Sequence, residues 1–256
     1  MAQRLHVSLK HEYEVYVEQE IENYKFSLSR QAMLRIGDEA VANLLESPQP
    51  EFGEIVLCSE VDRIIRQRLR TPSYSTWRRR RVKLLAQYRN PGHWGLAADA
   101  PLVREIVADA DSRVLVAGVE HREGPVLYLA AHGCQVTALE ENEEAVDRVV
   151  AAAGVVGLMS RVHGEPIGLG SWCPNAPFNA VVVTPKAFSG LSADQRTRVI
   201  DVLQGATLDG GVHLVETLIA GESTVTIEEL RARYDGWDVS LVADGSANTF
   251  LARKIA

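Results

Sequence analysis

Two hydrophobic patterns divide this 256-residue chain. In the first part, apolar residues recur at helical spacing and no segment has the alternation or the valine-rich run of a convincing strand. The segment 11–26 shows this helical spacing most clearly. It places these residues near one face of an amphipathic helix with a glutamate-rich outer side: Tyr13, Tyr16, Val17, Ile21 and Tyr24. In the second part, short apolar runs alternate with helical segments.

Three more helices are expected in the first part. Ser29 is a suitable N-cap for a helix through about Leu45, which the SPQPEFG segment then ends. A third helix is expected from Ser59, with Asp62 in the position of a capping-box partner, to about Arg70. Pro72 and Ser73 open a fourth, which ends before residue 90.

The second part begins with a strand–helix–strand unit. The valine-rich run 113–119 suits a strand that is buried on both faces of a parallel sheet. A helix over 125–132 follows, and Gly133 stands where a left-handed C-cap is wanted. The second strand, 135–139, leads directly into Glu140. An acidic residue at this point is typical of a nucleoside-binding, Rossmann-like unit.

The alternation continues to the C-terminus. Helices are expected after the caps Asn142, Ser192 (with Gln195) and Thr226 (with Glu229). The remaining strands are expected at 161–164, 178–184, 212–217, 238–242 and 249–254. The last two strands form a hairpin around Asp244-Gly245-Ser246. The right-handed crossover rule places helices on both faces of the sheet. The sequence therefore predicts an α/β, Rossmann-like doubly wound seven-stranded sheet with a C-terminal antiparallel hairpin, preceded by an all-α region.

Charge follows the same division. Residues 1–100 carry a net charge of +2 and residues 101–256 carry −9. The segment 91–100, PGHWGLAADA, has the composition of a joint. We therefore expect a helical region over 1–95 and a Rossmann domain over 96–256.

Composition excludes several other classes of protein. The chain has no 18-residue apolar run, so no membrane span is expected, and its first 20 residues lack the apolar stretch of a secretory signal. Its three cysteines are far apart and in no metal-ligand spacing, which favours free thiols in a reducing cytoplasm. No metal constellation is visible.

The order of segments over about 100–256 resembles the class I S-adenosylmethionine-dependent methyltransferases. The segments that carry the resemblance are VLVAG, VTALE, HGE, FNAVVVT, LDGGVHLVE, TIEELRARYDGWDV and FLARK, followed through to the terminal hairpin. The resemblance implies S-adenosylmethionine as cofactor and methyl transfer as the reaction.

The resemblance also implies a set of cofactor-binding residues: Gly118, Glu120, Gly124, Glu140 and Glu165. Glu140 would accept hydrogen bonds from both ribose hydroxyls, and Glu165 would lie near the adenine amino group. Each of these two glutamates has a simpler interpretation, as a helix-N-terminal acid and as a solvated loop residue respectively.

The loop after the first strand departs from the family pattern. It reads Gly118-Val119-Glu120-His121-Arg122-Glu123-Gly124, so Glu120 and Arg122 stand where the family has glycines. It also lacks the G-x-G-x-x-G spacing of NAD- and FAD-binding proteins, so binding of either dinucleotide is not supported.

Candidates for a catalytic base are the histidines 121, 163 and 213, although a lone histidine is more often structural. His121 is the best placed of them, because it lies in the cofactor loop itself. The segment Thr184-Pro185-Lys186-Ala187-Phe188 lacks the residues with which amino-group methyltransferases hold a planar nitrogen. The long loop 166–177 could form a substrate wall, a lid over the adenine or a plain connection.

Basic and aromatic residues are interleaved between Arg63 and Ala98. The segment has ten basic residues, no acidic one, and the aromatic residues Tyr74, Trp77, Tyr88 and Trp94. This composition suits nucleic acid, but it also suits docking on the acidic half of the chain or on a second copy.

Three hypotheses of function follow. The first is a cytoplasmic methyltransferase that acts on a small molecule, with the helical region as a lid, dimer surface or substrate cap. The second is a non-catalytic, methyltransferase-like binding or scaffolding protein with an altered ligand loop. The third is an RNA-modifying methyltransferase that docks through the basic segment 63–89.

Overall fold

The structure is a computed structural model that describes residues 8–46, 53–107, 112–120, 122–218, 225–244 and 247–255. The chain divides into two compact units, residues 1–84 and 85–256. The division falls eleven residues before the expected boundary at 95. Residues 85–95 group with the second unit because they contact residues further along the chain: the Arg89 guanidinium donates to the Ala131 carbonyl at 3.3 Å, and Gly124 packs against the Trp94 carbonyl.

The N-terminal unit contains the helices α1 (Leu9–Ser27), α2 (Arg30–Leu45), α3 (Glu54–Leu69) and most of α4 (Tyr74–Tyr88). Ser29 caps α2 as expected, accepting from the backbone N–H of Ala32. The core of the unit is made of buried apolar residues from three helices: Tyr13, Val17, Ile21, Ile36, Ala40, Val61, Ile64 and Ile65.

The expected start of the third helix at Ser59 is wrong. The helix α3 begins at Glu54, and the Ser59 hydroxyl donates to the carbonyl of Ile55 one turn earlier. Asp62 forms an ion pair with Lys25 at 2.7 Å instead of closing a capping box. A serine inside a helix forms hydrogen bonds with nearby backbone groups, as an N-cap serine does. The sequence pattern around Ser59 therefore does not distinguish the two positions.

In the C-terminal unit, seven strands of the described residues form one sheet in the order β3-β2-β1-β4-β5-β7-β6. The strands are β1 (Arg113–Ala117), β2 (Gln135–Leu139), β3 (Val162–Glu165), β4 (Phe178–Val183), β5 (Thr207–Leu218), β6 (Trp237–Asp244) and β7 (Ala247–Lys254). The pairs that involve β7 are antiparallel and the others are parallel. The predicted sheet and its terminal hairpin are confirmed.

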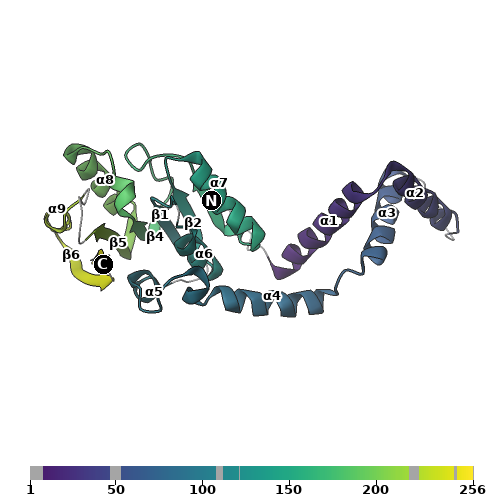
Figure 1. The fold of residues 1–256 in the computed structure, drawn as a ribbon, viewed down its shortest axis with the longest axis horizontal. Helices are drawn as coiled ribbons and strands as arrows, with labels where there is room; N and C mark the ends of the chain where they lie inside the picture. The colour runs from purple at the N-terminus through teal and green to yellow at the C-terminus, as the bar shows by residue number, and fades with distance from the viewer. Residues whose placement is uncertain are drawn as a thin grey trace. The chain divides into compact units, whose positions relative to one another are not determined.

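Helices cover both faces of this sheet (Figure 1). They are α5 (Pro101–Glu105), α6 (Glu123–Ala131), α7 (Glu143–Val155), α8 (Ala193–Gly205) and α9 (Ile227–Arg233), with the 3₁₀ turns η1 (Pro91–Trp94), η2 (Met159–Arg161) and η3 (Pro185–Phe188). The expected caps at Asn142, Ser192 and Thr226 are present, and Ser192 and Gln195 form a complete capping box.

Strand β5 starts at Thr207, five residues before its expected start. The LDGG segment reads as a turn, but Gly210 takes φ +75° inside the strand, next to a shift of the β4–β5 register. A glycine at positive φ beside a register shift is the mark of a β-bulge, which a turn signal resembles.

His213 on β5 lies in a buried polar network. Its Nε2 is 2.6 Å from the Thr207 hydroxyl, which itself donates to the Leu203 carbonyl at 2.7 Å. Nε2 therefore carries the proton, and Nδ1 accepts from the Tyr234 hydroxyl at 2.7 Å. Burial lowers the pKa of His213 to about 3, and Lys254 contributes to the shift. The imidazole is thus a neutral part of the core.

This burial predicts an acid-dependent loss of stability. The folded-state pKa of His213 lies below the unfolded value of about 6.5, so below that pH the unfolded chain binds one more proton at this residue. The free energy of unfolding should fall with decreasing pH more steeply in the wild type than in His213→Gln, by up to about 1.4 kcal/mol per pH unit between about pH 6 and pH 4. Urea unfolding at several pH values measures this, with Trp237, 4.8 Å from the imidazole, as a fluorescent reporter. Parallel pH profiles of the two proteins would contradict it.

Candidate functional site

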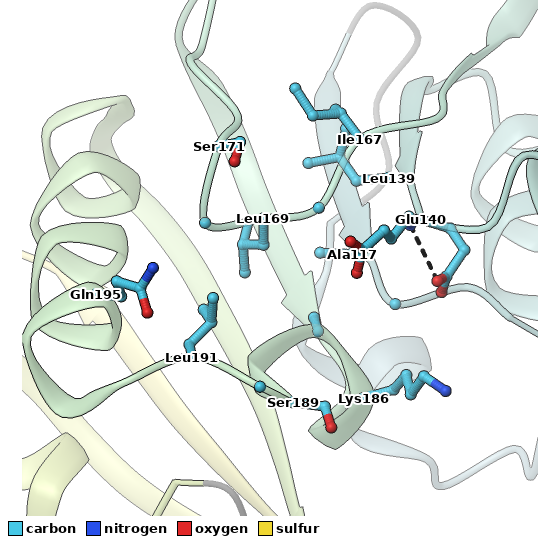
Figure 2. A pocket seen from close by; sticks show the side chains of 16 residues that line it. Ala117, Leu139, Glu140, Ile167, Leu169, Ser171, Lys186, Ser189, Leu191 and Gln195 are labelled. Atoms are coloured by element: carbon cyan, nitrogen blue, oxygen red, sulfur yellow. Dashed lines mark hydrogen bonds between the residues drawn. The ribbon is translucent and has the colours of Figure 1, made fainter.

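The carboxyl ends of β1, β2 and β4 border a cavity of about 270 Å³ (Figure 2). The strand order reverses here, because β2 and β3 lie on one side of β1, and β4 and β5 lie on the other. Ligands of open α/β sheets bind at such a switch point. The lining comes from the ends of β1 and β2, the loop after β3, the η3 turn and the start of α8.

Glu140 is the buried charge of this cavity, with 6% of its surface exposed. Its Oε2 accepts from the backbone N–H of Glu120 at 3.1 Å, and its Oε1 from those of Glu141 and Asn142 at 3.0 and 3.4 Å. Figure 2 shows the bond from Glu141. These donors compensate the burial of the carboxylate, and they tie the loop after β1 to the loop after β2. A carboxylate has about four acceptor positions, so capacity for a ligand remains.

Gly118 follows β1 and lines the cavity. Its φ is +81°, and a Cβ at this position would overlap the Thr184 hydroxyl and lie 3.0 Å from the Ala187 nitrogen. The Thr184 hydroxyl donates to the Gly118 carbonyl at 2.9 Å. A glycine is therefore required for the loop after β1 to lie against the loop after β4.

The two residues that depart from the family pattern are held by ion pairs to neighbouring strand ends. Glu120 accepts from Lys186, after β4, at 3.2 Å, and Arg122 pairs with Glu216 near the end of β5. Lys186 lines the cavity, whereas Glu120 and Arg122 do not. These ion pairs thus connect the loop after β1 to the residues that follow β4 and to the end of β5.

Gly124 and Glu165 also lie outside the cavity lining. Gly124 is in the first turn of α6, where a Cβ would lie 2.5 Å from the Trp94 carbonyl oxygen, so this glycine allows α6 to pack on η1. The Glu165 carboxylate accepts from the buried Trp172 indole at 2.8 Å, and its Oε1 lies 3.4 Å from Nε2 of His163.

The two candidate bases that the structure describes do not line the cavity. His121 lies outside the described residues. His163 is exposed on β3 beside Glu165, and His213 belongs to the core network. The part of the chain that the structure describes holds no group of three potential metal ligands, and none of its helices has the length and apolarity needed to cross a membrane.

Two segments build the rest of the cavity. The loop after β3, within the expected wall 166–177, contributes Ile167 and Leu169. Leu191, before α8, and Gln195, in its first turn, were not predicted as site residues. A Cβ at Gly170 would lie 2.7 Å from a Leu191 methyl group, so the two segments approach closely. The glycine spacing at 168 and 170 was the available signal for this contact.

No protein-family model matches the sequence, and a search among curated proteins gave no match. Solved structures are similar. The CcbJ methyltransferase from Streptomyces caelestis aligns over 58% of this chain and 86% of its own, with TM-score 0.50 and 14% identity. TehB from Haemophilus influenzae aligns over 61% of this chain and 60% of its own (TM-score 0.49, 18% identity), and the N-methyltransferase NodS from Bradyrhizobium japonicum over 62% and 100% (TM-score 0.47, 16% identity). The seven-stranded unit therefore has the Rossmann-like fold of the class I S-adenosylmethionine-dependent methyltransferases.

Proposed function

We propose that the cavity binds S-adenosylmethionine and that the protein transfers the methyl group to a small-molecule acceptor. The observation that carries this proposal is the position of Glu140, a buried carboxylate at the end of β2 where the strand order reverses. A carboxylate at this point suits the paired hydroxyls of a ribose.

The chemistry of the cavity residues fits an adenosine group. Ile167, Leu169 and Leu191 supply apolar surface for a base, and Glu140 supplies acceptor oxygens for hydroxyl donors. When bound, S-adenosylmethionine would supply an electrophilic methyl group on a sulfonium. The predicted contacts of Gly118 and Glu140 with the cofactor form part of the proposal. The predicted contacts of Glu120, Gly124 and Glu165 are left out of it, because these residues do not line the cavity.

The residues of this chain would hold the cofactor and orient its methyl group towards the acceptor. Methyl transfer needs chiefly the alignment of the acceptor with the methyl group. Glu140 would fix the ribose, and the three apolar side chains would exclude water from the base. The helical unit would then serve as a lid, dimer surface or substrate cap of a cytoplasmic enzyme.

A small acceptor is favoured over RNA by the aromatic residues of the basic segment. Tyr74 and Trp77 pack among the core residues of the helical unit, with ring centroids 5.5 Å from Tyr13. Tyr88 is buried as well. Partly or fully buried rings leave less surface on which a base could stack than exposed rings do.

A second candidate is a binding protein without transferase activity. The ion pairs Glu120–Lys186 and Arg122–Glu216 favour it, because they engage the loop that lies beside the cofactor in the methyltransferase fold. The two candidates share the ligand and differ in turnover.

Replacing Glu140 should weaken cofactor binding. Glu140→Ala removes the ribose acceptors and releases the N–H of Glu120, so the dissociation constant of S-adenosylhomocysteine should rise at least about tenfold in calorimetric titration. Glu140→Gln keeps one acceptor oxygen and should show a smaller effect. The matched control is Glu143→Ala, which removes an exposed glutamate three residues away that does not line the cavity. Wild-type affinity in Glu140→Ala would contradict the assignment of the site.

Turnover should separate the two candidates. The wild type, incubated with methyl-labelled S-adenosylmethionine and a fractionated cell extract, should label the small-molecule fraction, and Glu140→Ala should not. Binding of the cofactor with no label in any fraction would favour the binding protein, whereas label in the RNA fraction would overturn the small-molecule acceptor.

A further inference from the structure

One side of α2 carries apolar residues that the helical unit does not bury. Leu34, Val41 and Leu45 are 60%, 38% and 62% exposed, whereas Ile36 and Ala40 on the opposite side are fully buried. At 100° of rotation per residue, the residues on this exposed side of the helix fall within an arc of about 100° around its axis. Its members, called here the α2 stripe, are Arg30, Leu34, Gly37, Asp38, Val41 and Leu45.

The α2 stripe faces away from the helix on which α2 packs. The polar contacts between α2 and α3 come from other sides of α2: the Asn43 amide donates to Glu60 at 2.9 Å, and Glu39 pairs with Arg68. A Cβ at Gly37, halfway along the stripe and at one edge of its arc, would meet no atom of the described structure within 4 Å. A second helix could therefore approach the backbone of α2 closely at this point.

The charged residues at this side of the stripe can pair with those of a second copy of α2 in one arrangement only. Asp38 lies at one edge of the stripe, and Arg35 lies about 60° beyond it on the same side of the helix. Both are exposed, and neither has a salt-bridge partner among the described residues. Two parallel copies of α2 about a twofold axis would place these flanks on opposite sides of the interface, so that Arg35 of one copy could not meet Asp38 of the other. Two antiparallel copies centred near Gly37 would set Arg35 of each copy near Asp38 of the other, and Leu34 of each opposite Val41 of the other.

We propose that two copies of the chain associate through the α2 stripe, as an antiparallel helix pair about a twofold axis. The stripe is narrow, so the interface belongs to the small class and the dissociation constant should be of micromolar order. The proposal does not depend on the function of the cavity.

Sedimentation velocity of the full chain over a concentration series tests the interface. The wild type should pass from monomer to dimer, and the double variant Leu34→Glu/Val41→Glu should raise the dissociation constant about a hundredfold or more. The control is Val155→Glu on α7, where a valine that is 88% exposed lies outside the stripe, and its dissociation constant should equal that of the wild type. Circular dichroism should show all of these variants folded, because each replaced side chain is exposed.

A charge exchange tests the antiparallel arrangement. Arg35→Glu alone should weaken the dimer, because it sets an acidic group against the partner subunit's Asp38. Adding Asp38→Arg to the same chain should restore wild-type association. Both symmetry-related contacts would then again pair an acidic side chain with a basic one. A wild type that stays monomeric, a dimer unchanged by Leu34→Glu/Val41→Glu, or a double exchange that restores nothing would each overturn the proposal.

Discussion

The backbone hydrogen bonds to the Glu140 carboxylate are the constraint on which the candidate site depends. A buried charge is costly unless donors compensate it, and here the donors are the N–H groups of Glu120, Glu141 and Asn142. Two of these residues begin the connection to α7, and Glu120 belongs to the loop after β1. One side chain therefore determines how the two loops meet at the edge of the sheet. In the proposed function, the same oxygens would also receive the ribose.

Ion pairs also hold the loop after β1, in addition to the hydrogen bond from Glu120 to the Glu140 carboxylate. Glu120 and Arg122, at positions where the resemblance to the methyltransferases implies glycines, pair with Lys186 after β4 and Glu216 on β5. A glycine-rich loop derives its shape from backbone freedom, whereas this loop is held by side chains of opposite charge. At the point where this loop touches the loop after β4, a residue without a Cβ is needed at Gly118 alone, which has φ +81°.

The sequence predicted those features that depend on local interactions. The caps at Asn142 and Ser192 act within one helical turn, and the buried strands have short apolar runs, so both were recognisable. The starts of α3 and β5 were missed because a serine inside a helix resembles a cap and a bulge glycine resembles a turn. The orientation of Glu165 was not predictable, since its partner Trp172 comes from a loop whose path depends on tertiary packing. Leu191 and Gln195 were missed for the same reason.

The proposed function requires that Glu140, at the end of β2, receives the ribose of a nucleoside cofactor. A crystal structure of the full chain grown with S-adenosylhomocysteine tests it directly. The ligand is expected in the cavity at the carboxyl ends of β1, β2 and β4, with both ribose hydroxyls within hydrogen-bonding distance of the Glu140 carboxylate and the base among Ile167, Leu169 and Leu191. A ligand bound elsewhere, or one in this cavity whose ribose does not contact Glu140, would contradict the claim.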